Sequence, residues 1–142
     1  MKYTYAVLGA GRQGTASAYD MARWGEAERI ILCDRDLEIA VKAAERVNRL
    51  VGRQVAEATQ AEATDLAALE RVLTGVDAFV SAVPYYYNLA ITGVAIQVKA
   101  SMCDLGEILI SPGSSTPSMH RPARRESASS RTAGRCPVWV RR

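Results

Sequence analysis

The sequence has little cysteine and histidine, and it lacks any long apolar run. Its three cysteines, Cys33, Cys103 and Cys136, are odd in number and have neither the C-x-x-C spacing of redox motifs nor the spacing of metal ligands. Cys33 and Cys103 lie in apolar strand-like runs, where a free cysteine behaves as a small hydrophobe. We therefore expect free thiols in a reducing compartment, most simply the cytoplasm, and no metal site. No stretch of 18 apolar residues and no signal-peptide pattern occurs, so we expect neither a membrane span nor export.

Histidine is almost absent too, since His120 is the only one. The sequence therefore offers no ready histidine general base. Charge is uneven: residues 1–106 carry 11 basic and 13 acidic side chains, whereas residues 107–142 carry 7 and 2. The net charge of +3 thus reflects the C-terminal segment, and we expect no nucleic-acid surface on the rest. The length and the 49% hydrophobic content suit one globular domain.

A glycine triplet follows the first apolar run. Residues 5–8 have the character of a short buried strand, and Gly9, Gly11 and Gly14 then form G-x-G-x-x-G before a helical pattern. The first glycine permits a tight turn, the second lets the backbone approach a pyrophosphate, and the third lets the helix pack on the strand. A packing turn without a ligand is the alternative.

The helix after this turn is expected from about residue 13 to residue 24, where Gly25 ends it. Its N-terminus would offer free N–H groups and the positive end of the helix dipole to the phosphates of a dinucleotide. The residues that we expect to bind the pyrophosphate are Gly9, Gly11, Arg12, Gln13 and Gly14.

An acidic residue ends the second apolar run. Residues 29–33 read as a buried parallel strand, and Asp34 follows twenty residues after Gly14. A carboxylate at this place accepts hydrogen bonds from the adenosine ribose and repels a 2′-phosphate, which favours NAD over NADP. The neighbouring Arg35 could stack on adenine or hold that phosphate, so NADP remains the alternative. Asp34 could also cap the next helix.

The middle of the sequence continues the alternation of helices and strands. Residues 37–51 form an amphipathic pattern closed by Gly52, residues 55–61 are a weaker strand candidate, and residues 66–73 form a helix with Asp65 as its N-cap. Glu62 falls where the third strand ends, which is the adenine edge of such a site. A bridging or solvated carboxylate is equally consistent with that position.

A fourth buried strand is expected over residues 78–83, and it ends in Ala82, Val83 and Pro84. Small residues at the carboxyl end of a strand let a ribose or flat ring lie close, so this loop should border the nicotinamide half of the cofactor. Tyr85, Tyr86 and Tyr87 follow, and they either wall that pocket or pack against a second domain.

The fifth strand is expected over residues 101–106, after a helix over residues 89–99 that Asn88 would cap. Asp104 would lie at the carboxyl end of this strand, near the reacting centre. The five strand candidates are separated by helices and by no hairpins. The sequence therefore predicts an α/β fold, a Rossmann-type doubly wound parallel sheet.

Four stretches together resemble the cofactor domain of the saccharopine dehydrogenase family, and above all its lysine 6-dehydrogenase-like branch. They read Val-Leu-Gly-Ala-Gly-Arg-Gln-Gly, Cys-Asp-Arg-Asp, Ser-Ala-Val-Pro-Tyr-Tyr-Tyr-Asn and Met-Cys-Asp-Leu-Gly. The resemblance covers residues 3–106. It implies NAD(P)-dependent oxidation of a C–N bond in an amino acid, with hydride passing to nicotinamide and water opening the resulting imine. It also implies a second α/β domain that supplies most substrate contacts, in a full-length parent that can form homo-oligomers.

The family pattern continues Gly-Asn-Thr-Asp/Glu-Ile after Asp-Leu-Gly, and this chain departs from it at Glu107. Deleting one G from the glycine codons of such a continuation can produce the reading Gly-Glu-Ile-Leu-Ile-Ser-Pro-Gly that is present. We therefore hypothesise that residues 107–142 are frameshifted. This segment holds four of the five prolines, seven serines and seven arginines, so we expect it to be irregular or disordered, without a domain.

These observations favour the cofactor-binding half of an amino-acid dehydrogenase, truncated before its substrate domain. Such a chain would bind the dinucleotide but would not turn over alone. Two other interpretations stay open. One is a stand-alone dinucleotide-sensing module, which shares the glycine triplet and Asp34. The other is a non-functional fragment that exposes an apolar edge meant for its missing domain.

Overall fold

The structure is a computed structural model, and it describes residues 2–105. Strands and helices alternate along this part of the chain. The expectation of an irregular segment over residues 107–142 lies outside the described residues. The elements are β1 (Tyr3–Leu8), α1 (Arg12–Trp24), β2 (Ala27–Asp34), α2 (Leu37–Val51), β3 (Ala56–Gln60), α3 (Leu66–Leu73), β4 (Ala78–Ser81), the 3₁₀ turn η1 (Tyr85–Tyr87), α4 (Asn88–Val98) and β5 (Ser101–Asp104).

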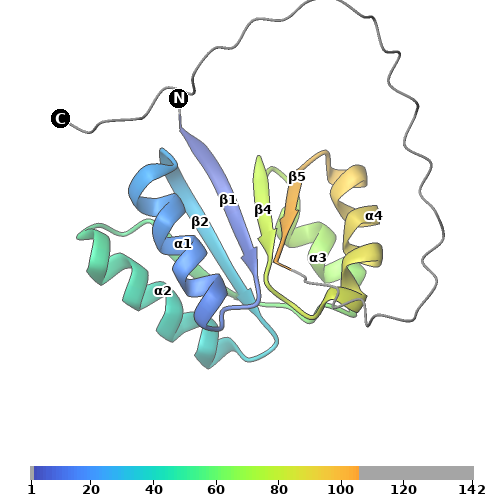
Figure 1. Cartoon of the computed structure of the whole chain (residues 1–142), viewed down its shortest axis with the longest axis horizontal. Coiled ribbons are helices and arrows are strands. Elements are labelled where there is room, and N and C mark those ends of the chain that lie inside the picture. Colours follow the sequence, from blue (N-terminus) through green and yellow to red (C-terminus); the bar gives the residue numbers. More distant parts are fainter. Residues whose placement is uncertain (1, 106–142) are drawn as a thin grey trace, which may run out of the picture. The chain divides into compact units, whose positions relative to one another are not determined.

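The five strands form one parallel sheet in the order β3-β2-β1-β4-β5 (Figure 1). The chain starts in the middle with β1, runs outward through β2 and β3, returns to the other side of β1 with β4, and continues outward to β5. This is a doubly wound sheet, as the sequence predicts. The strand order reverses between β1 and β4, which is where ligands bind in such sheets.

Helices cover both faces of the sheet. Alternate residues of β1 point to opposite faces, so Val7 packs with the alanines of α1 and α2, whereas Ala6 and Leu8 pack with α3 and α4. Small alanines on α1 and α2 let these two helices lie close to each other and to the sheet. Two layers of core therefore hold the central strand, and the loop that follows β1 is fixed from both sides.

The caps of the helices explain most of their bounds. Asp36 caps α2, since its Oδ1 accepts a hydrogen bond from the Glu38 N–H at 2.9 Å, and Gly52 ends that helix in a left-handed conformation with φ of 72°. Asp65 caps α3 as predicted, accepting from the Ala68 N–H at 2.9 Å.

Asn88 does not cap α4, contrary to the sequence-based expectation. It is the first residue of the helix, and its side chain instead accepts a hydrogen bond from the buried Ser81 hydroxyl at 2.7 Å. The preceding η1 turn runs directly into α4, so no residue with extended backbone stands where a capping side chain would act.

Candidate functional site

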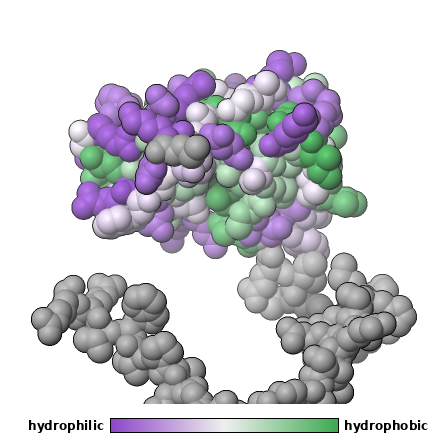
Figure 2. Space-filling view, turned by 90° about the horizontal axis from the view of Figure 1, so that it is seen from above, coloured by the Kyte–Doolittle hydropathy of each residue, from purple (hydrophilic) through white to green (hydrophobic). Residues whose placement is uncertain are grey.

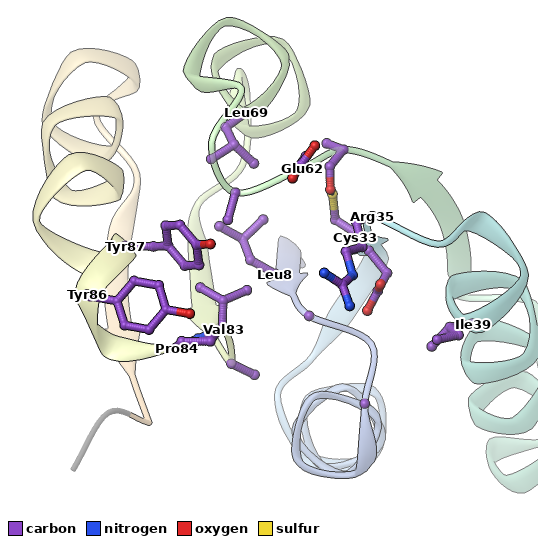
Figure 3. Close-up of a pocket in the computed structure, with 16 residues that line it drawn as sticks. Leu8, Cys33, Arg35, Ile39, Glu62, Leu69, Val83, Pro84, Tyr86 and Tyr87 are labelled. Carbon is purple, nitrogen blue, oxygen red and sulfur yellow. The ribbon is translucent and has the colours of Figure 1, made fainter.

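A pocket of about 520 Å³ opens at the carboxyl ends of β1, β2 and β4 (Figure 3). Its floor is apolar, with Leu8, Cys33 and Leu69, and its charged groups are Asp34, Arg35 and Glu62. The strand order of the sheet reverses at this place, between β1 and β4. The lining residues are Leu8, Gly9, Gly11, Cys33, Asp34, Arg35, Ile39, Ala61, Glu62, Ala63, Leu69, Ala82, Val83, Pro84, Tyr86 and Tyr87.

The three glycines of the turn are needed for three different reasons. Gly9 has φ of +92°, and a Cβ there would lie 2.7 Å from the Ala82 carbonyl oxygen. A Cβ on Gly14 would lie 1.8 Å from the Gly9 carbonyl oxygen, so α1 can approach the turn only without a side chain. Gly11 has nothing within 4 Å of its Cβ position. The space beside Gly11 is thus open, and a ligand could approach the backbone there.

The N-terminus of α1 faces this open space with its backbone N–H groups. Gly11 is the N-cap residue, no side chain caps the helix, and its first turn holds no acidic residue. The first N–H groups of a helix have no intrahelical partner, and with the helix dipole they attract phosphate. The turn therefore fits the pyrophosphate of a dinucleotide, because it supplies donors, positive potential and room for close approach.

Asp34 ties the end of β2 to the glycine turn. Its Oδ2 accepts a hydrogen bond from the Ala10 N–H at 2.8 Å, and its Oδ1 accepts one from the Asp36 N–H at 3.1 Å. Its carbonyl accepts from the Ala61 N–H at 3.1 Å. The capping role that the sequence left open for Asp34 belongs to Asp36. Asp34 lines the pocket, and each carboxylate oxygen keeps further lone pairs for hydroxyl donors.

Arg35 and Glu62 lie on the same side of the pocket as Asp34, next to the ends of β2 and β3. The Arg35 carbonyl accepts a hydrogen bond from the Gln60 side chain at 3.0 Å, which links the loops after the two strands. Ile39, from the first turn of α2, contributes an apolar side chain to this wall. The Arg35 guanidinium is suited to stack on the face of a purine, and the Glu62 carboxylate is suited to its polar edge. Ile39 is suited to pack against the purine ring.

The opposite wall follows β4. Ala82, Val83 and Pro84 line the pocket there. The Ala82 N–H donates to the Leu8 carbonyl at 2.8 Å, so this loop is fixed beside the glycine turn. Its place in the pocket supports a contact with a bound dinucleotide.

Three of the predicted pyrophosphate residues do not line this pocket. Gly14 is buried behind the turn, where it contacts Gly9, and Gln13 is exposed on the first turn of α1. Arg12 lines a neighbouring groove between α1 and α2, together with Lys42 and Arg46. Binding by these three residues therefore stays a prediction. The close approach of Gly14 to the Gly9 carbonyl agrees with the packing role that the sequence indicates for the third glycine.

Other residues line the pocket although sequence reasoning did not single them out. Cys33 is buried, as the sequence predicts for a small hydrophobe, and burial raises the pKa of its thiol to about 11, with the Asp34 charge adding to the effect. It is thus a neutral part of the pocket floor. Cys103 is exposed rather than buried, contrary to expectation.

Two other features are not found in the described part of the chain. Residues 2–105 contain no cluster of three or more His, Cys, Asp or Glu side chains placed to hold a metal ion. None of the helices in the same range is long and apolar enough to cross a membrane.

Comparisons with known proteins agree with the site. The model of a family described as the saccharopine dehydrogenase NADP binding domain matches residues 5–137. This match runs past Glu107, where the sequence analysis placed the end of the resemblance, so the frameshift remains a hypothesis.

Solved structures share the fold. Quinate dehydrogenase from Corynebacterium glutamicum in complex with NAD is 26% identical, with a TM-score of 0.50, over 57% of this chain and 27% of that one. Saccharopine dehydrogenase (L-Glu forming) from Saccharomyces cerevisiae is 23% identical, with a TM-score of 0.59, over 78% and 22%. A short-chain dehydrogenase/reductase from Veillonella parvula in complex with NADP is 12% identical, with a TM-score of 0.58, over 73% and 47%.

The chain spans only 27% and 22% of the lengths of the first two of these proteins. The family match, in contrast, includes most of this chain and all of the pocket. The glycine turn, the uncapped α1 N-terminus and the Asp34 carboxylate are the features of an NAD(P)-binding domain. The chain belongs to the saccharopine dehydrogenase NADP binding domain family.

Proposed function

We propose that this chain is the cofactor-binding part of an NAD(P)-dependent oxidoreductase that acts on the C–N bond of an amino acid of the lysine or saccharopine type. The observation that carries the proposal is the pocket at the strand-order reversal, with an open glycine turn on one side and Asp34 on the other. When bound, NAD(P) supplies a hydride acceptor. The chain's own residues bind and orient it.

Each part of the pocket has a distinct task in this proposal. The α1 N-terminus binds the pyrophosphate, and the Asp34 carboxylate accepts hydrogen bonds from the adenosine ribose. Ala82 to Pro84 support the other half of the dinucleotide. Asp104 ends β5, beside Ser81 in the sheet register, and it is exposed. We assign no catalytic residue, since the substrate-binding part of the enzyme is proposed to lie outside this chain.

We propose NAD as the preferred cofactor, with NADP as the alternative. The Asp34 carboxylate is held at the end of β2 by two backbone N–H groups, so it cannot turn away from a 2′-phosphate without losing both hydrogen bonds. Arg35 stands next to it and opposes this discrimination. Calorimetric titration of Asp34→Ser with both dinucleotides tests the balance.

Asp34→Ser should lower the affinity for NAD about tenfold, because a hydrogen bond to a charged group contributes about 1.5 kcal/mol or more. It should lower the affinity for NADP less, so the preference narrows or reverses. Asp36→Ser is the matched control, since serine also caps helices and Asp36 does not line the pocket. An unchanged ratio of the two affinities in Asp34→Ser would refute the proposed preference.

The reaction class needs a test on the complete enzyme. Sequencing the coding DNA should reveal, in another frame after codon 106, a continuation that resembles the family pattern. The frame-restored protein should then reduce NAD in the presence of lysine or saccharopine. A folded, NAD-binding restored protein that is inactive with every amino acid would overturn the proposed C–N chemistry. A restored protein that binds NAD but turns over no substrate of any class would instead favour a dinucleotide-sensing regulatory module.

A further inference from the structure

A second groove lies between α1 and α2, outside the dinucleotide pocket. Its volume is about 610 Å³, and the residues that line it extend from Gly11 and Ile39 to Tyr19 and Leu50. Figure 1 shows the two helices side by side on one face of the sheet. Among residues 2–105, the groove shares only Gly11 and Ile39 with the pocket, which opens at the carboxyl ends of the strands. The groove is therefore a separate surface, and the proposed function gives it no role.

The groove is lined by three cations and, within the described part of the chain, by no carboxylate. Arg12 comes from the first turn of α1, whereas Lys42 and Arg46 lie one turn apart on α2. Like charges at such a spacing repel each other. The acidic residues of the two helices lie outside the groove, and they are Asp20, Glu38 and Glu45. An anion between the helices would therefore relieve this repulsion.

The protein itself neutralises these cations only weakly. The Lys42 ammonium lies 3.6 Å from the Glu38 carboxylate, and the two side chains are 75% and 84% exposed. An exposed pair of this kind contributes little to stability and is readily exchanged for another anion. Neither Arg12 nor Arg46 forms an ion pair with another described residue. A ligand can therefore bind both guanidinium groups without breaking a strong contact.

The other residues of the groove favour the binding of an anion. Ala16 and Ala43 have small side chains, which leave room between the helices. Ile39 and Leu50 add apolar surface, and charges beside apolar surface are screened less than charges that water surrounds. Tyr19 also lines the groove, and its hydroxyl can donate a hydrogen bond. The guanidinium groups offer planar forks of N–H donors, which match the oxygens of a phosphate group.

We infer that the groove between α1 and α2 is a second anion-binding site, for a small ligand that carries two or more neighbouring phosphate groups. Arg12 and Arg46 bind phosphate oxygens from opposite helices, and Lys42 supplies the third positive charge. A single phosphate would leave part of this charge unpaired. The site does not depend on the dinucleotide role, because Lys42 and Arg46 line the groove and not the pocket.

Titration of the ¹⁵N-labelled full chain with inorganic tripolyphosphate tests this site by NMR, with NAD at saturation so that the glycine turn is occupied. The amide signals of groove residues such as Ala16, Tyr19 and Ala43 should shift. Arg46→Gln should weaken tripolyphosphate binding about tenfold, because it removes hydrogen bonds between charged groups. A variant that combines Arg46→Gln with Lys42→Gln should show no binding. Far-UV circular dichroism checks that each variant is folded.

Arg49→Gln is the matched control, since Arg49 is exposed on the same helix but lies outside the groove. It should change the affinity for tripolyphosphate by less than about twofold. Equal weakening by Arg46→Gln and Arg49→Gln, shifts confined to residues 9–14, or no binding at all would overturn the inference. Binding that is lost when NADP replaces NAD would also overturn it, because the groove would then hold the 2′-phosphate of the cofactor. Tripolyphosphate binding in the groove of a wild type that does not bind NAD would contradict the dinucleotide role alone.

Discussion

The two halves of the sheet differ in how completely they are packed. In the first half, β1 to β3 with α1 and α2, the helices bury their alanines and present charged side chains outward. In the second half, α4 has apolar residues on its exposed side as well as on its buried side, and it leaves Leu89 88% and Ile96 74% exposed. Figure 2 shows hydrophobic surface toward the side of α3 and α4 and hydrophilic surface toward α1 and α2.

The ends of the helices show the same difference. Helix α2 begins with the Asp36 cap and ends at Gly52, which adopts its left-handed conformation without strain. Helix α4 has no side-chain cap, and it ends at Lys99 with φ of 59°, where a side chain costs about 1 kcal/mol. Helix α2 thus has a favourable capping residue at each end, whereas α4 has none. The exposed half supports the proposal that a further part of the enzyme packs there.

Glycine substitutions should give the largest contrast between the halves. Gly14→Ala places a Cβ 1.8 Å from the Gly9 carbonyl oxygen, so we expect a loss of about 3 kcal/mol or more in the free energy of unfolding. Gly93→Ala, in the middle of α4, meets no atom within 4 Å and should stabilise the protein by about 0.5–1 kcal/mol. Urea unfolding measures both. Similar effects of the two changes would remove the contrast.

Asparagine substitutions should give a smaller contrast. The Asn48 side chain makes four hydrogen bonds at 2.8–2.9 Å, which bind α2 to the start of β3 through Gln54, Val55 and Ala56. Asn48→Ala leaves buried backbone groups without partners and should cost about 2–3 kcal/mol. Asn88→Ala loses the single hydrogen bond to Ser81 and should cost about 1 kcal/mol.

Thermal and urea unfolding of both asparagine variants, with far-UV circular dichroism to check the native fold, decide this comparison. Asn48→Asp refines it, because a carboxylate keeps the acceptor for Val55 and Ala56 but loses both donated hydrogen bonds. An Asn88→Ala variant that is less stable than Asn48→Ala would show that the second half carries the more important polar contact.

The cysteines should differ in reactivity while the fold stays unchanged. Burial raises the pKa of Cys33 to about 11, whereas Cys103 is exposed. Because each pKa unit changes the thiolate fraction about tenfold, the raised pKa alone should slow alkylation of Cys33 at neutral pH about 100-fold relative to a thiol at the model value of 9.0. The exposed Cys103 should therefore be alkylated first. Mass spectrometry of a Cys136→Ser protein measures both rates. Equal alkylation rates at the two cysteines would contradict the burial of the Cys33 side chain at the end of β2.

The raised pKa of Cys33 also has a consequence for stability at high pH. The native thiol retains its proton up to about pH 11, whereas the unfolded thiol loses it near its ordinary pKa. The native state therefore binds more protons between these values, and the free energy of unfolding should fall as pH rises through this window. Cys33→Ala should reduce that fall.

The sequence was sufficient for the elements whose signals are local. Residues 37–51 and 66–73 have the predicted bounds, because amphipathic spacing and the residues around each end agree. The five-stranded parallel sheet follows from the alternation of strands and helices. Gly9, Gly11 and Asp34, which line the pocket, belong to a motif whose spacing has a physical basis, and their contact with a cofactor stays a prediction.

The remaining features depend on contacts between distant residues. Nothing local shows that the Asn88 side chain binds Ser81, or that the cap of α2 is Asp36 instead of Asp34. The three tyrosines have the same local sequence signal, and only the packing of η1 on the core directs two of them to the pocket. Cys103 resembles a core residue in sequence, but β5 is an edge strand.

The central claim is that the open turn at Gly11 binds a dinucleotide. Gly11 has an ordinary φ of −68° and free space at its Cβ position, so Gly11→Val should fold like the wild type while its side chain fills the phosphate site. Calorimetric titration with NAD is the most direct test. We predict one NAD bound per wild-type chain and none by Gly11→Val, which should remain folded. Equal NAD binding by both proteins, or none by the folded wild type, would contradict the claim.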